Sequence, residues 1–166
     1  MNIGRSHGYL EGVGRLRLHY RVWEATDPRA GLLLIHGLSD HSGRYTELGE
    51  HMASVGLSTY ALDLRGHGYS EGRRGHARSF ELFLQDLERF RREVQGLTRP
   101  GLDLFLLGHS MGGLVVIRYL EEYDVPLGGA VLVSPWLGTA LPVPRWKLNL
   151  ARVLGRVLPA LPIPAN

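Results

Sequence analysis

The chain of 166 residues contains no cysteine, which excludes a disulfide framework and a thiolate metal site. No apolar run approaches the roughly 18 residues of a membrane span, and the first ten residues lack the apolar segment of a secretory signal peptide. These absences predict a cytoplasmic protein, and the length predicts one domain. We expect no metal ion and no cofactor.

Acidic residues are missing from residues 136–166, which carry four basic side chains. The rest of the chain holds 15 basic and 16 acidic residues. The net charge of +3 and the isoelectric point near 9.5 therefore arise in the tail, and not from a basic stripe across a domain. We expect no nucleic-acid partner.

Apolar segments alternate along the chain between strand-like runs and helical spacing. Short runs such as Leu32–Ile35 are typical of strands that are buried on both faces of a parallel sheet. The sequence thus predicts an α/β fold with a mostly parallel sheet and an antiparallel hairpin at its start. The expected strands are residues 9–11, 16–23, 32–35, 57–62, 102–107 and 130–133, and the expected helices are residues 45–55, 80–97 and 114–120.

Two details of the 80–97 helix follow from side-chain chemistry. Ser79 is expected to cap its N-terminus, and Glu88 is expected to pair with Arg92 on the solvent-exposed face. Residues 65–78, which precede this helix, are rich in glycine and predict a loop. A glycine-rich motif that binds a dinucleotide is followed directly by a helix. Because a long loop follows Gly66–Gly68, the sequence does not predict a dinucleotide site there.

The stretch Gly108–Gly112 reads Gly-His-Ser-Met-Gly and follows an apolar strand. A strand, a G-x-S-x-G turn and a helix form the context in which a serine acts as a nucleophile. The turn at Ser110 would be so sharp that a side chain two residues before or after the serine would clash with neighbouring backbone. Glycine at both positions would avoid this clash. The hydroxyl would then lie at a helix N-terminus, which favours an oxyanion. The pattern alone also arises by chance.

A second loop supports the nucleophile interpretation. His36 and Gly37 end the earlier buried strand, and a backbone N–H from such a loop is one of the two donors that an oxyanion hole needs. The other donor is the N–H of Met111. Taken in isolation, His36 and Gly37 could equally form a simple turn with a packed histidine.

Four stretches of the chain resemble the monoacylglycerol lipases and their lysophospholipase-like relatives, a branch of the α/β-hydrolase fold. They occur in the order and spacing of that family, and the resemblance spans nearly the whole chain. One departure is Asp40, where the family usually has glutamate. The stretches are His36–Tyr45 (HGLSDHSGRY), Asp63–Gly72 (DLRGHGYSEG), Leu106–Gly113 (LLGHSMGG) and Val131–Pro135 (VLVSP).

The resemblance implies a serine carboxylester hydrolase that forms an acyl-enzyme on Ser110, with oxyanion N–H groups from Leu38 and Met111. The implied substrate is a small acyl ester with one long chain, a monoglyceride or a lysophospholipid. Residues 1–135 would form the N-terminal part of the hydrolase core, and residues 136–166 would begin the cap. Gly108, His109, Gly112, His36 and Gly37 are expected to support the turn and the loop.

The partners of the serine are missing from the chain. In this fold the order is serine, acid, histidine, yet no histidine follows Ser110, and the acids after it, Glu121, Glu122 and Asp124, end the helix that leaves the serine. The upstream histidines are expected to pack or to support loops, with a rewired base as the less favoured alternative. We expect a chain that stops before the acid and the base, lacks the last strands and helices, and is nearly inactive alone.

Such a chain would leave the strand at 130–133 as an unpaired sheet edge, which invites pairing with another chain. The expected partners are a C-terminal half or a second copy. Two other functions stay open: a generic esterase, thioesterase or peptidase-like hydrolase, and a non-catalytic or two-chain binding protein derived from a hydrolase. The intact serine turn argues against the non-catalytic alternative.

Residues 145–158 place apolar side chains at helical spacing, with arginines elsewhere on the helix. This pattern is typical of a helix that contacts a membrane surface, so peripheral membrane contact is one expectation. A cap helix packed over the acyl pocket, with solvated arginines, is the other, and both could hold.

Overall fold

The computed structural model describes residues 3–138, 144–147, 149–150 and 153. The chain divides into two compact units, Met1–Trp136 and Leu137–Asn166. In the second unit, residues 145–147, 149–150 and 153 are helical, and the rest of the amphipathic stretch predicted over 145–158 lies outside the described residues. None of the described helices has the length and apolar character needed to cross a bilayer.

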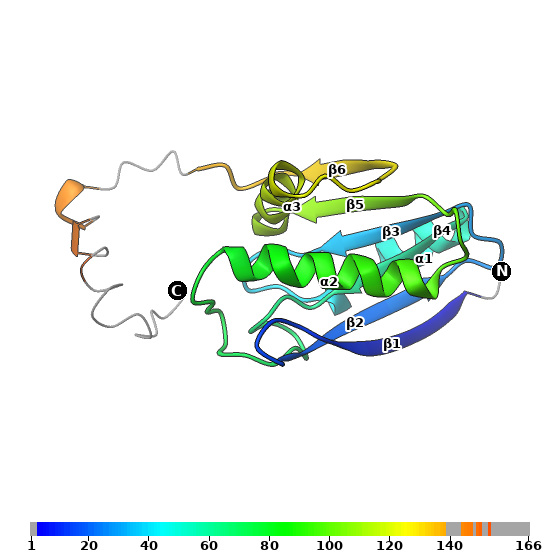
Figure 1. Cartoon of the computed structure of the whole chain (residues 1–166), viewed down its shortest axis with the longest axis horizontal. Coiled ribbons are helices and arrows are strands. Elements are labelled where there is room, and N and C mark those ends of the chain that lie inside the picture. Colours follow the sequence, from blue (N-terminus) through cyan, green and yellow to red (C-terminus); the bar gives the residue numbers. More distant parts are fainter. Residues whose placement is uncertain (1–2, 139–143, 148, 151–152, 154–166) are drawn as a thin grey trace. The chain divides into compact units, whose positions relative to one another are not determined.

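The first unit contains a six-stranded sheet in the order β1-β2-β4-β3-β5-β6 (Figure 1). β2 pairs antiparallel with β1 and with β4, whereas β3–β4, β3–β5 and β5–β6 are parallel pairs. The predicted mostly parallel sheet with an antiparallel hairpin at its start is confirmed. The strands are β1 Gly4–Glu11, β2 Arg17–Glu24, β3 Ala30–Ile35, β4 Leu57–Leu62, β5 Leu104–His109 and β6 Gly129–Val133.

Helices cover both faces of the sheet (Figure 1). A short 3-10 turn, Ser42–Tyr45, leads into α1, Thr46–Ser54, which lies on one face, and α2, Glu81–Leu97, and α3, Met111–Glu122, lie on the other. The chain leaves α1 through Gly56, whose φ of +89° favours glycine. This agrees to within one residue with the prediction that the helix ends at residue 55.

β3 runs through the middle of the sheet and is buried along its whole length. Leu33 and Ile35 belong to the core beneath α2 and α3, and Leu32 and Leu34 belong to the core beneath α1. Apolar and polar residues do not alternate along β3, because both faces of the strand are covered. The carboxyl ends of β3 and β5 consequently emerge side by side at one edge of a rigid sheet.

The predicted cap at Ser79 is wrong. Phe80 occupies the N-cap position of α2, and no side chain caps the helix. The ring of Phe80 lies 5.8 Å from the ring of Phe83, and Phe80 packs against the main core. Packing of an aromatic side chain, and not a capping hydroxyl, therefore fixes where this helix begins.

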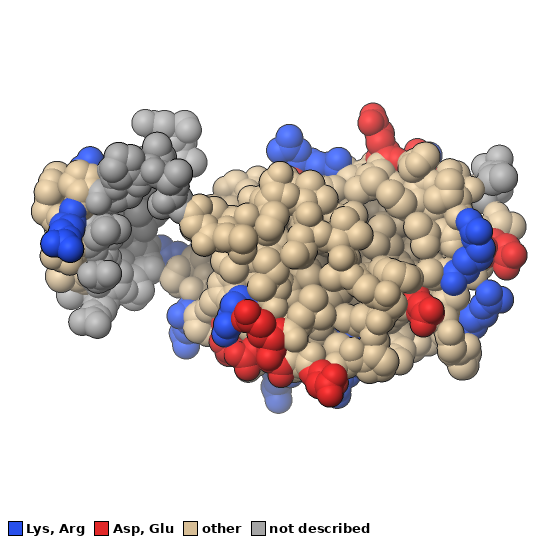
Figure 2. Space-filling model, turned by 90° about the horizontal axis from the view of Figure 1, so that it is seen from above, with Lys and Arg blue, Asp and Glu red and all other residues tan. Residues whose placement is uncertain are grey.

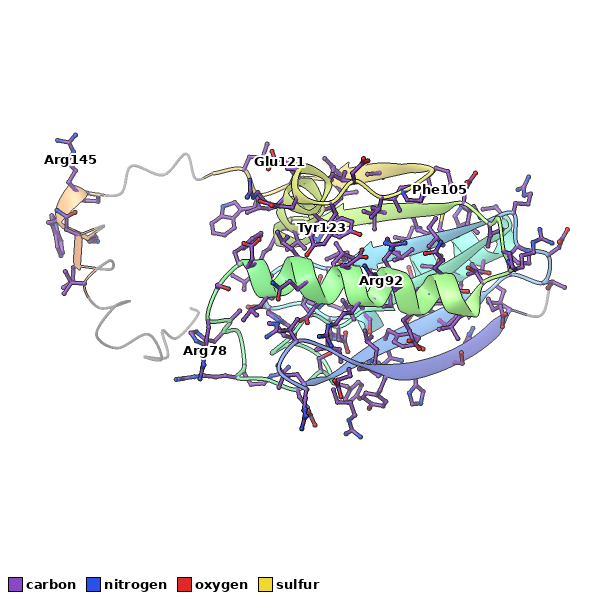
Figure 3. The ribbon with its side chains drawn as sticks, viewed as in Figure 1. Arg78, Arg92, Phe105, Glu121, Tyr123 and Arg145 are labelled. Atoms are coloured by element: carbon purple, nitrogen blue, oxygen red, sulfur yellow. The ribbon has the colours of Figure 1, made fainter. Side chains whose placement is uncertain are left out.

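The predicted exposed position of Glu88 is also wrong. Glu88 is buried and accepts hydrogen bonds from Tyr119 on α3 and from Arg91 at 2.9 Å, as well as from Arg92 at 2.5 Å. Burial by itself raises the pKa of Glu88, but these donors outweigh it and lower the pKa to about 2. Figure 3 labels Arg92 on α2 and Tyr123, which follows α3.

β6 forms one edge of the sheet among the described strands. Its residues Val131, Leu132 and Val133 are 50%, 40% and 42% exposed. Figure 2 views the molecule from the side of β6 and shows a broad uncharged area in the middle of the first unit, with charged residues at its margins. An apolar parallel strand is thus exposed to solvent here, which is unusual for this class of sheet.

Candidate active site

Ser110 is the single residue that separates β5 from α3. Its backbone has a φ of 53° and a ψ of −118°, a conformation that costs a non-glycine residue strain and persists only where the surroundings enforce it. The turn places Ser110 at the N-terminus of α3, where free N–H groups and the helix dipole favour a negative charge.

Neighbouring backbone explains the glycines around Ser110. A Cβ atom on Gly108 would lie 2.6 Å from the carbonyl oxygen of Gly112, and a Cβ atom on Gly112 would overlap the carbonyl oxygen of Ile35 at the end of β3. Both glycines are therefore required for α3 to start directly over the ends of β3 and β5.

Two backbone hydrogen bonds from the end of β6 hold the turn. The N–H of Ser110 donates to the carbonyl of Val133 at 3.0 Å, and the N–H of Trp136 donates to the carbonyl of Ser110 at 3.0 Å. These bonds fix the backbone of Ser110 on both sides and supply the constraint that the strained conformation needs.

A hollow of about 370 Å³ lies beside Ser110. The loop after β3 reaches into it, and a Cβ atom on Gly37 would lie only 3.1 Å from the Cβ atom of Ser110. Among the described residues, neither the Leu38 nor the Met111 N–H donates a hydrogen bond. The hollow is lined by Gly37, Leu38, Ser39, Asp40, Arg44, Tyr45, His109 and Ser110.

His36 is fully buried beneath this loop. Its Nδ1 lies 2.7 Å from the carbonyl oxygen of Gly37 and must donate to it, while Nε2 accepts from the N–H of Leu64 at 3.0 Å. Burial lowers the pKa of His36 to about 4, so the ring is neutral near pH 7. Both nitrogens are engaged, and the contacts are those of a loop support.

The sequence assigned no functional role to Tyr45, which was expected only to begin the helix over residues 45–55. Its hydroxyl donates to a carboxylate oxygen of Asp40 at 2.8 Å, and Nδ1 of His109 lies 3.0 Å from it. Since the hydroxyl has a single proton, His109 must donate from Nδ1. Burial and the Asp40 carboxylate raise the pKa of Tyr45, which therefore remains a neutral link between the two loops.

Asp63, at the end of β4, was also missed as an organising residue. Its carboxylate accepts from the N–H of Ser42 at 2.6 Å and of Tyr69 at 2.9 Å, and lies 2.8 Å from Nδ1 of His19. Burial raises the pKa of Asp63, but these donors outweigh burial and lower it. The sequence signals were its position directly after an apolar strand and its place at the start of the stretch Asp63–Gly72, neither of which gave it a role.

No base contacts Ser110 within the described part of the chain, where no side chain hydrogen-bonds to its hydroxyl. Glu121 and Glu122 pair with Arg118 at 2.6 and 3.0 Å on the last turns of α3 (Figure 3). The described residues also contain no cluster of histidine and carboxylate side chains that could hold a metal ion. The site therefore combines a strained serine with two free N–H groups.

Comparison with known proteins gives consistent matches. Residues 26–166 match the family described as serine aminopeptidase, S33. A monoacylglycerol lipase of Mycolicibacterium smegmatis is 37% identical over 163 residues, which are 96% of this chain and 57% of that protein. The monoglyceride lipase of Homo sapiens is 39% identical over 146 residues, which are 87% of this chain and 48% of that protein.

The crystal structure of a monoacylglycerol lipase from Paleococcus ferrophilus matches with a TM-score of 0.70 at 36% identity. The match covers 97% of this chain and 54% of that one. The chain thus spans about half the length of the relatives that it matches, and the resemblance read from the sequence motifs is confirmed.

Proposed function

Because the chain belongs to the serine aminopeptidase S33 family of α/β hydrolases and resembles its monoacylglycerol lipases, we propose that it carries the nucleophile of a serine carboxylester hydrolase. The observation that carries this proposal is the backbone of Ser110, held with a φ of 53° at the N-terminus of α3. Strain of this kind is retained at functional sites.

In the proposed reaction, the Ser110 hydroxyl attacks the ester carbonyl and its proton passes to a base. The N–H groups of Leu38 and Met111 bind the oxyanion that forms. The alcohol leaves with the transferred proton, and water then hydrolyses the acyl-enzyme. The unpaired state of both N–H groups supports this assignment.

We assign the base and its orienting acid to sequence outside residues 1–166. The order serine, acid, histidine in this fold and the match to about half of each relative support this assignment. The exposed edge of β6 supports pairing with the strands that would carry those residues. Residues 1–166 alone should then hydrolyse esters at least about a thousandfold more slowly than the whole protein.

The proposed substrate is a small ester with one long acyl chain, either a monoglyceride or a lysophospholipid. The names of the relatives support the monoglyceride. Residues 145–158 would contact the lipid surface, on the strength of their apolar spacing and basic residues. Binding of the whole protein to vesicles, with and without Arg152→Gln and Arg156→Gln, tests that contact.

Labelling of the whole protein with a fluorophosphonate tests the nucleophile. We expect one label per chain, on the peptide that contains Ser110, and loss of both label and ester hydrolysis in Ser110→Ala. Ser6→Ala, at an exposed position of β1, is the matched control and should keep both. An unlabelled wild type would favour a non-catalytic binding protein, and a label that persists in Ser110→Ala would show that the reactive nucleophile is another residue.

A further inference from the structure

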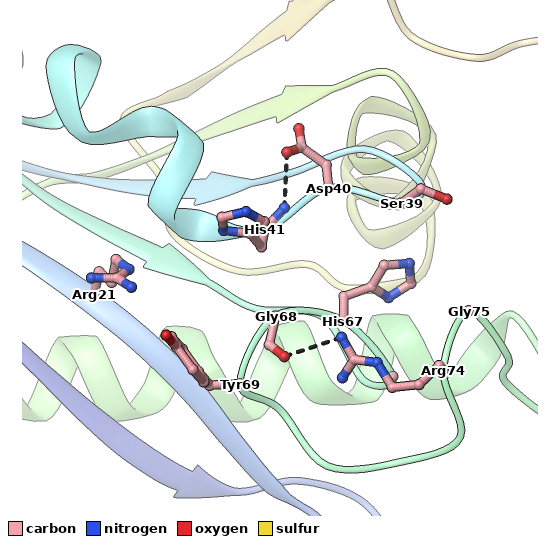
Figure 4. Close-up of a pocket in the computed structure, with 10 residues that line it drawn as sticks. Arg21, Ser39, Asp40, His41, His67, Gly68, Tyr69, Arg74 and Gly75 are labelled. Carbon is pink, nitrogen blue, oxygen red and sulfur yellow. Dashed lines mark hydrogen bonds between the residues drawn. The ribbon is translucent and has the colours of Figure 1, made fainter.

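We propose that a second hollow, next to the one at Ser110, binds a phosphate group. It has a volume of about 480 Å³ and shares Ser39 and Asp40 with the hollow at Ser110. β2 and residues 66–75 supply its other walls (Figure 4). The proposal goes beyond the hydrolase function and does not require Ser110 to be catalytic.

Two arginines line this hollow, and neither forms an ion pair with a described residue. Nε of Arg21 is buried without a hydrogen-bond partner, and its guanidinium lies 5.9 Å from the ring centroid of Tyr69. Arg74 donates to the carbonyls of Ser70 and Gly68 at 3.2 and 3.1 Å, which leaves further N–H donors. A buried guanidinium N–H without an acceptor is costly, and an anion would satisfy it.

Asp40 contributes a carboxylate to the wall, but its oxygens already have donors. They accept from the hydroxyl of Tyr45 at 2.8 Å and from the N–H of His41 at 2.9 Å, and Nε of Arg44 lies 3.6 Å away. The charge of Asp40 is thus largely compensated by its own loop. The two arginines leave the hollow with an excess of positive charge.

His67 provides a hydrogen-bond acceptor beside these donors. It is 4% exposed, and its Nδ1 donates to the carbonyl of Arg65 at 3.0 Å, while its Nε2 has no partner. Burial lowers the pKa of His67, and the charge of Arg74 acts in the same direction. The ring is therefore neutral near pH 7, and Nε2 is a buried acceptor without a partner on a residue that lines the hollow.

A ligand that satisfies all of these groups must combine anionic oxygens for the arginines with a hydroxyl that donates to His67. A phosphate that keeps a P–OH group meets both requirements, and so does a phosphate ester of glycerol. Sulfate has the same shape and charge but no proton to donate near pH 7. The chemistry thus favours phosphate, which free phosphate or a glycerophosphate headgroup could supply.

Calorimetric titration of the whole protein tests the site, with inorganic phosphate, glycerol 3-phosphate and sulfate as probes at constant ionic strength. We expect one phosphate per chain with a Kd of about 1 mM or tighter, and sulfate at least about tenfold weaker because His67 is left without a donor. Tighter binding of glycerol 3-phosphate would identify a headgroup site, and equal binding a site for free phosphate. The Ser110→Ala variant should bind the probes equally well, which separates this site from the hydrolase proposal.

Variants of single arginines locate the site. Arg21→Gln and Arg74→Gln should each weaken phosphate binding by about tenfold or more. Arg73→Gln removes the same charge one position away, from a residue that lines a different hollow, and should leave the affinity unchanged. If Arg74→Gln fails to fold, the phosphate affinity of Arg21→Gln alone decides whether the hollow is the binding site.

Three results would overturn the proposal. The first is a lack of phosphate binding in the folded wild type, and the second is equal affinity for sulfate and phosphate. The third is the same loss of affinity in Arg73→Gln as in the variants of the lining arginines, because a general effect of charge would then explain the binding.

Discussion

The hydroxyl of Tyr45 lies 3.0 Å from Nδ1 of His109 and donates its proton to Asp40. Tyr45 ends the turn before α1, and His109 is the last residue of β5. A single hydroxyl thus connects the residue next to Ser110 with the loop that carries Leu38. The positions of the proposed nucleophile and of one proposed oxyanion donor depend on the same link.

Removal of this hydroxyl in Tyr45→Phe should affect both stability and turnover. A hydrogen bond to a charged acceptor contributes about 1.5–3 kcal/mol, and we expect a loss of this size in urea unfolding. We also expect kcat for ester hydrolysis by the whole protein to fall by about tenfold, since misplaced groups lose transition-state contacts. Tyr9→Phe, at an exposed position of β1, is the control. A loss of stability with unchanged kcat would reduce Tyr45 to a structural role.

Gly112→Ala tests the turn itself. Its Cβ atom would overlap the carbonyl oxygen of Ile35, so we expect a destabilisation of about 3 kcal/mol or more. Gly96→Ala is the matched control, because nothing lies within 4 Å of a Cβ atom at this position of α2, and it should stabilise the protein by about 0.5–1 kcal/mol. Thermal unfolding measures both, and equal melting temperatures for the two variants would contradict the described packing.

The lowered pKa of His36 predicts how stability depends on pH. Its pKa falls from 6.5 to about 4 on folding, so the unfolded chain takes up the proton first. The stabilisation is complete above pH 6.5 and is lost as the pH falls toward 4. Between about pH 7.5 and 5, His36 should account for a loss of about 2 kcal/mol.

Urea unfolding at these two pH values tests the contribution of His36. His36→Gln should lose less stability than the wild type as the pH falls. The stability of His36→Gln should still fall with pH, because burial also lowers the pKa values of His19 and His67. His51→Gln, on the exposed face of α1, controls for the loss of a histidine. An identical slope in His36→Gln and the wild type would show that His36 titrates normally.

The contacts of Glu88 predict unequal effects for two of its partners, Tyr119 and Arg92. Tyr119→Phe removes a buried donor from a carboxylate and should cost about 1.5–3 kcal/mol. Arg92→Ala removes a partner whose side chain is 73% exposed, so it should cost no more than about 1 kcal/mol. Chemical denaturation of the two variants measures both losses of stability. A larger loss in Arg92→Ala than in Tyr119→Phe would mean that the exposed ion pair contributes more than the buried hydrogen bond.

Local patterns in the sequence located much of the sheet and the turn at Ser110. β4 was predicted at its observed bounds, Leu57–Leu62, because its apolar run ends at recognisable loops. The glycines at 108 and 112 could be interpreted because the constraint lies within a few residues of Ser110. β1 was predicted too short, because Gly4–His7 are exposed and belong to the strand only through pairing with β2.

The features that the sequence did not reveal depend on contacts between distant residues. Tyr119 is 31 positions from Glu88, and His109 is 64 positions from Tyr45. No periodicity within α2 indicates that α3 covers Glu88. The spacing of an apolar stripe likewise cannot show that the polar end of Tyr45 reaches another loop. Such contacts arise from the order of the strands, which places β5 beside β3.

The backbone bonds that join Ser110 to the end of β6 also bear on when its turn can be completed during synthesis. Both bonds are made with residues that the ribosome adds later, Val133 and Trp136. A nascent chain folds from its N-terminus as it emerges, so β3 and β5 can pair before β6 exists. We therefore expect the serine to acquire its final backbone conformation only after residue 136 has left the ribosome.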